Sequence, residues 1–361
     1  MKLNINPEKI KAFKGPQKKH FYFVTNKEFV DMFELQDNDG FLSNNVLMLS
    51  VDTSFEDLLE NSIPEDSCVL VVSPNVFFSS PLQDKIGSRR IIAMACNSTP
   101  THIEDIHHFW DCLINTDPLE QQQRTDVFFE LGENSEYLKF IDNTNKTSAI
   151  FNHLDESYLW SEQTGLLNDG EQQLAPSGEI SVLPIAIQEF NEDLRLDFTG
   201  SIAFHGAPIL HSGTPSFTRK DQKRIYNDLS VLNDNAVLAE LKSGVIEEIF
   251  ATNGESQKAV DMLNCMFKID SRYRILWEIG FGINSAIKIR EGNHAMNETY
   301  GGKNGCIHFG LGLTPYTQYH LDIVCPSMTV LTSDDQLLIG TKSRKMRSIR
   351  NSSTNCLCAE N

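Results

Sequence analysis

The first part of the chain alternates short apolar runs with segments of helical periodicity. Four runs of strand length are continuously hydrophobic, which is typical of strands covered on both faces of a parallel sheet. They are residues 21–24, 46–49, 68–72 and 90–94. Between and after them, apolar residues recur at helical spacing in 27–33, 54–60 and 102–113. The pattern predicts an amino-terminal domain of α/β layers.

Further along the chain, the hydrophobic runs become shorter and more strand-like. Polar residues, glycine and proline cluster near 142–145 and 168–178, so we place the domain boundary in this interval. The predicted strands are 179–186, 194–204, 236–241, 245–250, 275–282, 305–312, 320–324, 329–332 and 336–339. An amphipathic helix is predicted at 255–267.

These patterns together predict an α/β protein in which an amino-terminal α/β layered domain is followed by a strand-rich α+β domain. The predicted divisions are the first domain at 1–145, a linker or boundary region at 146–175, the second domain at 176–341 and a basic tail at 342–361 that we expect to be flexible.

Composition limits the partners that the protein can have. The formal net charge of −18 over 361 residues argues against nucleic acid and anionic membrane, because phosphate binding requires clustered Lys and Arg. The amino terminus lacks the apolar core of a secretory signal, and no run approaches the roughly 18 apolar residues of a membrane helix. The eight cysteines are dispersed, without a Cys-x-x-Cys pair. We therefore expect a cytoplasmic protein.

Two imidazoles and a carboxylate stand on neighbouring apolar runs in the second half. One residue separates His320 from Asp322, so on a strand both side chains project to the same face. His308 lies on the preceding run. Two histidines and one carboxylate form a set that leaves open positions on zinc, cobalt, manganese or ferrous iron. The sequence therefore predicts a divalent metal site at these three residues.

The other histidines are interpreted as incidental. His107 and His108 lie beside acidic residues on a predicted helix, where a solvated face explains them. His205 and His211 flank a Gly-Ala-Pro turn, and although they could line a cleft, lone histidines around a turn more often have no role. The chain has no Gly-x-Ser-x-Gly nucleophile elbow, so a serine hydrolase triad is not indicated.

Five short motifs follow one another in the second half of the chain. They are Pro-Ser-Gly-Glu-Ile at 176–180, Leu-Lys-Ser-Gly-Val-Ile-Glu at 241–247, Trp-Glu-Ile-Gly-Phe-Gly-Ile-Asn at 277–284, Gly-Cys-Ile-His-Phe-Gly-Leu-Gly at 305–312 and His-Leu-Asp at 320–322. Their order resembles the aminopeptidase T family of metallopeptidases, also called the thermophilic aminopeptidase group. The fold of that family is shared by a 2,5-dihydroxypyridine dioxygenase.

The resemblance implies a catalytic domain in which five side chains surround one or two divalent ions. Carried over by position, they are Glu179, Glu278, His308, His320 and Asp322. In the family, a further glutamate shortly before the motif histidine helps to hold the second ion. Here Gly-Gly-Lys-Asn occupies that place, and the nearest acid, Glu298, lies ten residues before the histidine. The resemblance also implies a peptide or small-molecule substrate and a homodimer.

Three side chains are candidates for roles in the reaction itself. Trp277 and Ile279 flank Glu278, which suggests that this carboxylate is buried and needs a cation or hydrogen bonds. Tyr316 and Tyr319, close to the His-x-Asp pair, are candidates for a phenol that stabilises a developing oxyanion.

Three functions remain open at this point. The family resemblance favours a metal-dependent hydrolase that cleaves an amide or peptide bond with a metal-activated water. The absent second-metal glutamate favours instead a mononuclear non-haem iron oxygenase acting on a small aromatic or peptide-derived substrate. A further hypothesis is a degenerate homologue that binds peptide without catalysis.

Overall fold

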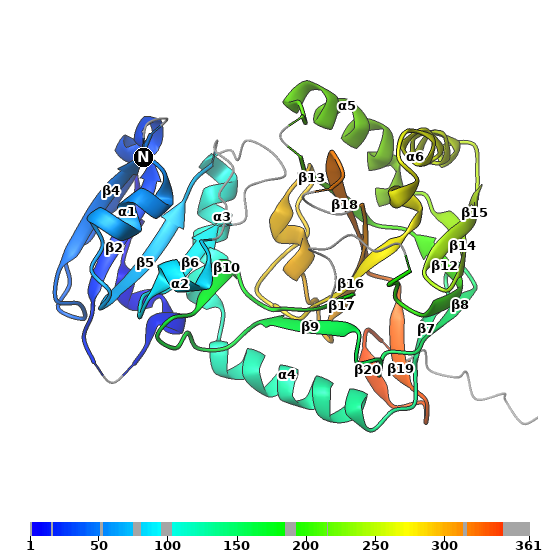
Figure 1. Cartoon of the computed structure of the whole chain (residues 1–361), viewed down its shortest axis with the longest axis horizontal. Helices are drawn as coiled ribbons and strands as arrows, with labels where there is room; N and C mark the ends of the chain where they lie inside the picture. Colours follow the sequence, from blue (N-terminus) through cyan, green and yellow to red (C-terminus); the bar gives the residue numbers. More distant parts are fainter. Residues whose placement is uncertain are drawn as a thin grey trace, which may run out of the picture.

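The structure, a computed structural model, describes residues 2–15, 17–50, 53–74, 81–94, 103–184, 193–214, 216–312 and 316–341. An amino-terminal lobe built on a parallel sheet lies beside a larger lobe built on two antiparallel sheets (Figure 1). The basic tail predicted at 342–361 falls outside the described residues.

The amino-terminal lobe is built on a five-stranded parallel sheet with the order β10-β6-β5-β2-β4. Its strands are β2 (His20–Asn26), β4 (Asn44–Leu49), β5 (Ser67–Val72), β6 (Arg90–Met94) and β10 (Gln172–Ala175). The first four coincide with the four predicted runs. Every residue of β5 and β6 is buried, which explains why these runs are continuously apolar.

Helices cover both faces of this sheet. The helix α3 (Ile103–Asn115) packs on one face, while α1 (Phe55–Asn61) and α2 (Gln83–Ile86) pack on the other. The predicted helices at 54–60 and 102–113 are thus confirmed. The third predicted helix, at 27–33, is a 3-10 helix, η3 (Lys27–Met32), followed by β3 (Phe33–Leu35), which pairs with β1 (Leu3–Ile5).

Two antiparallel sheets form the larger lobe. The six-stranded sheet has the order β13 (Ala207–Ser212), β18 (Tyr319–Cys325), β17 (Cys306–Leu311), β16 (Leu276–Gly282), β11 (Glu179–Pro184) and β9 (Tyr158–Gln163). The seven-stranded sheet has the order β15 (Val245–Ala251), β14 (Val237–Lys242), β12 (Phe198–Phe204), β8 (Thr147–Phe151), β7 (Leu138–Asp142), β19 (Thr329–Thr332) and β20 (Leu337–Ile339).

The two antiparallel sheets share one hydrophobic core. Phe140 and Phe198 from the seven-stranded sheet pack against Phe309 from the six-stranded sheet, with ring centroids 6.1 and 5.9 Å from it. Helices α5 (Arg219–Leu229) and α6 (Gln257–Ile269) lie at one end of this lobe, and α4 (Pro118–Glu133) runs alongside β9 (Figure 1). The remaining 3-10 helices of the described residues are η1 (Pro7–Lys9), η2 (Lys11–Phe13), η5 (Ser230–Asn233), η6 (Ser271–Arg274) and η7 (Ala295–Thr299).

This architecture confirms the α/β fold class predicted from the sequence. The domain boundaries stay a prediction. Strand pairing crosses them, because β7 and β8 join the seven-stranded sheet of the larger lobe, whereas β10 joins the parallel sheet of the amino-terminal lobe. The pattern missed α4 because its buried positions include Gln121, Thr125 and Gly132, which leave no apolar stripe. None of the described helices has the length and apolar character needed to cross a bilayer.

The buried carboxylate of Asp142 ties two turns of the larger lobe together. Its Oδ2 accepts hydrogen bonds from Ser327 at 2.6 Å and from the side chain of Asn145 at 2.7 Å. Burial alone would raise the pKa of Asp142, but these hydrogen bonds, with those from the backbone of Asn145 and Thr144, outweigh burial and lower it. The charged form therefore stabilises the fold at neutral pH.

We predict that Asp142→Asn lowers the free energy of unfolding by about 2 kcal/mol at pH 7, because hydrogen bonds to a charged acceptor are lost. Since the folded pKa is lowered, the contribution of Asp142 is present above the unfolded pKa of about 3.9 and is lost as the pH falls through the folded value. Urea unfolding at pH 7 and pH 3 measures both effects. The exposed Glu136→Gln is the control, and equal stability of Asp142→Asn and wild type at pH 7 would contradict the prediction.

Candidate metal centre

The two faces of the six-stranded sheet have opposite character. Successive residues of a strand point to opposite faces, and on one face Ile180, Phe309 and Leu321 join the shared core. The other face carries the polar residues Glu179 on β11, Glu278 on β16, His308 on β17, His320 and Asp322 on β18, and His211 on β13. These strands are direct neighbours, so distant stretches of sequence converge here. We call these six residues, together with Glu298, the polar cluster.

Glycines leave the space in which the polar cluster fits. Gly280 pairs across the strands with His308, and a Cβ added to Gly280 would collide with the imidazole ring of His308. A Cβ added to Gly310 would lie 2.7 Å from the Cβ of Glu278 and 3.0 Å from Oδ1 of Asp322. The glycines of the Gly-x-Gly and His-x-Gly motifs therefore make room for the side chains beside them.

The five residues predicted as ligands from the motifs lie on one face of the sheet, but the donor atoms of His308 do not form one compact group with those of His320 and Asp322. Nε2 of His308 lies 3.3 Å from Oε1 of Glu179. Nε2 of His320 lies 3.3 Å from Oε2 of Glu278 and 3.0 Å from Oδ1 of Asp322. The other ring nitrogen of His320, Nδ1, is 2.9 Å from the carbonyl oxygen of Gly312. If Nδ1 donates to this carbonyl, Nε2 keeps its lone pair toward the cluster, which is the usual arrangement of a metal-binding histidine.

His211 corrects the sequence interpretation. It was interpreted as incidental, but its Nε2 contacts Glu298 and lies 3.2 Å from Oδ2 of Asp322. His211 stands on β13, in cross-strand register with His320. In the sequence, only a short apolar run at 207–210 precedes this histidine. The run does not indicate with which other strand it pairs.

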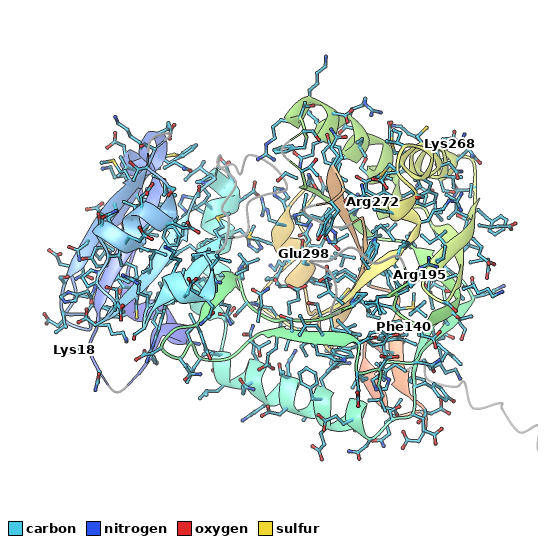
Figure 2. All side chains as sticks on the ribbon, in the orientation of Figure 1. Lys18, Phe140, Arg195, Lys268, Arg272 and Glu298 are labelled. Atoms are coloured by element: carbon cyan, nitrogen blue, oxygen red, sulfur yellow. The ribbon has the colours of Figure 1, made fainter. Side chains whose placement is uncertain are left out.

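Glu298 reaches the polar cluster despite its distance from His308 in the sequence. Figure 2 labels Glu298 on η7, beside the six-stranded sheet. Its carboxylate contacts the imidazole of His211. The structure therefore supplies an acid at the cluster where the local sequence Gly-Gly-Lys-Asn does not.

The donor atoms of the cluster fall into three groups, each compact enough to hold a metal ion. They are Glu179, Glu278 and His308; Glu278, His320 and Asp322; and His211, Glu298 and Asp322. Oδ1 of Asp322 and Oε1 of Glu298 are buried and accept no hydrogen bond of good geometry, although imidazole nitrogens lie near them. Buried carboxylate oxygens of this kind need a positive partner. Carboxylate and imidazole donors suit a divalent metal ion, so the residues present fit such an ion.

The acidic surroundings make the imidazoles of the cluster strongly basic. Burial lowers the pKa of His308, but the hydrogen bond and charge of Glu179, with the charge of Asp322, outweigh burial and raise it to about 10. A similar balance raises the pKa of His211 to about 9 and that of His320 well above its usual value. The cluster thus attracts positive charge, and a divalent ion bound here would displace these protons.

Neither candidate tyrosine is a member of the polar cluster. Tyr319 alternates with His320 along β18, and its hydroxyl lies 3.2 Å from Oδ2 of Asp221, beside α5. Its phenol therefore points away from the polar face, which contradicts the predicted oxyanion role. Tyr316 packs against a small apolar cluster that includes Trp277.

Two of the five motifs contact each other and hold β11 against β16. The side chain of Asn284 donates to the carbonyl oxygen of Ser177 at 2.6 Å. Gly178 has a φ of +113°, and a Cβ there would lie 2.8 Å from the Cβ of Asn284. These contacts fix the start of β11, and hence Glu179, beside the strand that carries Glu278.

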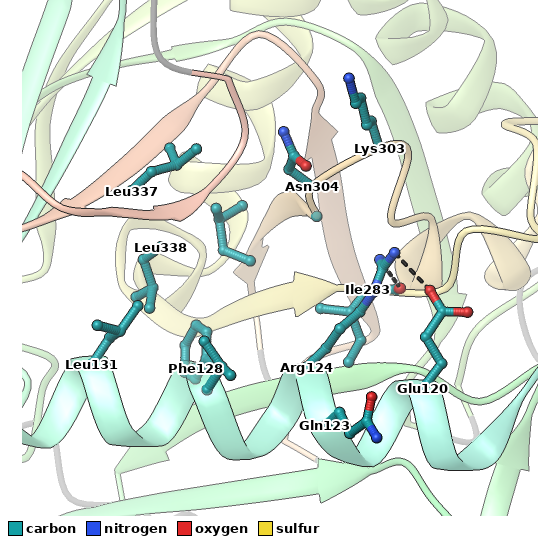
Figure 3. Close-up of a pocket in the computed structure, with 13 residues that line it drawn as sticks. Glu120, Gln123, Arg124, Phe128, Leu131, Ile283, Lys303, Asn304, Leu337 and Leu338 are labelled. Atoms are coloured by element: carbon teal, nitrogen blue, oxygen red, sulfur yellow. Dashed lines mark hydrogen bonds and ion pairs between the residues drawn. The ribbon is translucent and has the colours of Figure 1, made fainter.

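A separate cavity of about 490 Å³ lies between α4, the end of β16 and the hairpin of β19 and β20 (Figure 3). None of the residues that line it belongs to the polar cluster. Lys303 lines this cavity and is exposed. Arg124, on α4, donates to the carbonyl oxygen of Ile283 at 3.1 Å and pairs with Glu120 at 2.8 Å (Figure 3).

Comparisons with known proteins give a distant structural likeness. Neither protein-family models nor curated protein sequences match the chain. Among solved structures, it is similar to one titled 2,5-dihydroxypyridine dioxygenase from Pseudomonas putida KT2440, with 14% sequence identity and a TM-score of 0.48 over 90% of this chain and 92% of that chain. The resemblance to aminopeptidase T thus has no family match behind it, while the dioxygenase that shares the fold of that family is a distant neighbour.

We predict that Gly280→Ala and Gly310→Ala each weaken divalent metal binding by at least about 10-fold, because the added methyl group displaces His308 or Asp322. Isothermal titration with Mn²⁺ or Zn²⁺ measures the change, and circular dichroism checks the fold. Gly254→Ala is the matched control, because a Cβ at Gly254 meets nothing within 4 Å. Wild-type affinity in both cluster variants would show that the polar face beside Gly280 and Gly310 does not hold the metal.

Proposed function

We propose that the protein is a metal-dependent enzyme, and specifically a hydrolase of amide or peptide bonds that holds two divalent ions in the polar cluster. The observation that carries this proposal is the overlap of the ligand groups. Glu278 belongs to two of the three groups, and Asp322 belongs to two as well. Seven convergent ligands are more than one catalytic ion with open positions needs, whereas shared carboxylates are suited to adjacent ions.

When bound, adjacent divalent ions would lower the pKa of a water and polarise a substrate carbonyl. The chain's own residues set the direction from which a substrate arrives. The side chains of Asp322 and His308 are 2% exposed, whereas those of Glu278, His320 and Glu298 are 15%, 13% and 17% exposed. A substrate therefore approaches on the side of the last three.

A second candidate function is favoured by a different set of contacts. His211 lies 3.2 Å from Oδ2 of Asp322 and His320 lies 3.0 Å from Oδ1, so two histidines meet the two oxygens of one carboxylate, although their donor atoms do not form one compact group. This is the ligand set of mononuclear non-haem iron enzymes, which leave open positions for substrate and dioxygen. The alternative is therefore an iron oxygenase acting on a small aromatic or peptide-derived substrate. The side-chain geometry carries this candidate, and the distant structural likeness does not.

We predict that protein purified without chelator or added metal contains two equivalents of zinc, cobalt or manganese per chain by elemental analysis. His320→Ala should lose at least one equivalent, because its Nε2 lies between two carboxylates of the cluster. His107→Ala, a histidine on α3 outside the cluster, should keep both. About one equivalent of iron would favour the second candidate. A protein without bound metal would favour the non-catalytic peptide-binding hypothesis.

We also predict that the metal-loaded protein releases free amino acids from aminoacyl amides without consuming dioxygen. Asp322→Asn should abolish this release, because Asp322 contributes to two ligand groups. A panel of amides and small aromatic compounds, followed with amino-acid analysis and an oxygen electrode, separates the two functions. Dioxygen uptake that depends on an aromatic compound would show that the oxygenase hypothesis is right and the hydrolase hypothesis is wrong.

A further inference from the structure

Glu298 is the member of the polar cluster that does not come from a strand of the six-stranded sheet. It lies on the loop of residues 284–300, which we call the Glu298 loop. The loop is closed at its base by backbone hydrogen bonds, from the amide of Asn284 to the carbonyl of Thr299 at 3.1 Å and from the amide of Gly301 to the carbonyl of Asn284 at 2.9 Å. The position of the Glu298 carboxylate therefore depends on what holds this loop.

One side of the Glu298 loop is held by the larger lobe. The side-chain amide of Asn293 both accepts from the backbone amide of Leu210 at 2.7 Å and donates to its carbonyl at 2.8 Å. Leu210 precedes His211, the imidazole that Glu298 contacts. These two hydrogen bonds bring the loop to β13, beside the residue that Glu298 meets.

The other side of the loop is held by the amino-terminal lobe. Nε of Arg290 lies 2.7 Å from Oδ1 of Asp105, a buried carboxylate on α3. Met296 is 3% exposed and packs into the hydrophobic core of the amino-terminal lobe. The thiol of Cys112, also on α3, lies 3.5 Å from the carbonyl oxygen of Ala286.

The contact with Asp105 is relayed to Glu298 through the interior of the loop. The backbone amide of Arg290 donates to Oδ1 of Asn297 at 2.9 Å, and Nδ2 of Asn297 donates back to the carbonyl of Arg290 at 3.0 Å. Asn297 is fully buried and directly precedes Glu298. A shift of Arg290 therefore moves the backbone that carries the acid.

We propose that Asp105 of the amino-terminal lobe is a positioning residue for the metal centre, acting through Arg290 and the Glu298 loop to hold Glu298 in the third ligand group. This inference rests on the proposed two-ion site and adds a role for the first lobe. Without the contact from α3, Glu298 leaves His211 and Asp322, and the ion at that group is lost. The ligand group of Glu179, Glu278 and His308 consists of strand residues and is unaffected.

The test compares metal affinity in Asp105→Ala with that in Glu104→Gln, a change at an exposed acid one position earlier on α3. Titration of the full-length protein with Mn²⁺, starting from metal-free samples, resolves the first and second equivalents. We expect Asp105→Ala to bind the second equivalent about 10-fold to 100-fold more weakly and the first with wild-type affinity. Glu104→Gln should match the wild type in both.

A double-mutant cycle distinguishes positioning from general loosening. Glu298→Gln should weaken the second equivalent by itself, and adding Asp105→Ala should cause little further loss, because both changes act through one carboxylate. If Asp105→Ala does not fold, Asp105→Asn and Arg290→Gln replace it in the same cycle. Additive losses, or equal weakening of both equivalents in a folded variant, would overturn the inference. A wild-type protein that binds no second ion would overturn the proposed function instead.

Discussion

The structure depends on how negative charge is balanced where four carboxylates lie together in one largely buried site. Glu179 and Asp322 are 7% and 2% exposed, and Glu278 and Glu298 lie beside them. Among the described residues, the ion pairs of these four acids are all to histidines. Three imidazoles can balance four carboxylates only in part, even when all carry a proton. Repulsion among buried like charges is costly, so a fold that gathers these acids is stable when cations occupy the space between them.

The six-stranded sheet satisfies two demands at once because its strands alternate. One set of side chains fills the core shared with the seven-stranded sheet, and the other set forms the polar cluster. Apolar neighbours such as Phe309 and Ile323 therefore fix the backbone from which His308 and Asp322 project. Glycine at 280 and 310 keeps the polar face open at the positions where any other residue would fill it. Core packing and site geometry are thus properties of the same strands.

Local patterns predicted much of the fold and part of the site. The buried parallel strands are continuous apolar runs, and α6 carries its apolar residues on one face, so both could be predicted from spacing alone. The His-x-Asp pair could be placed on one face for the same reason. His211 could not, because its role depends on β13 pairing with β18 across more than a hundred residues of sequence. The oxyanion role predicted for Tyr319 is wrong because Tyr319 and His320 are adjacent residues of one strand, and such residues point to opposite faces of the sheet.

The seven residues of the polar cluster differ in how firmly the fold holds them. Six project from adjacent strands, where cross-strand register and a packed core leave their backbones little freedom. Glu298 projects from a loop held between two lobes, and a contact between lobes opens more readily than the interior of a sheet. The groups formed by strand residues alone should therefore persist when the lobes move. The group that includes Glu298 should assemble only when both lobes contact the Glu298 loop. An amino-terminal lobe that contributes no ligand would in this way still decide whether the centre is complete.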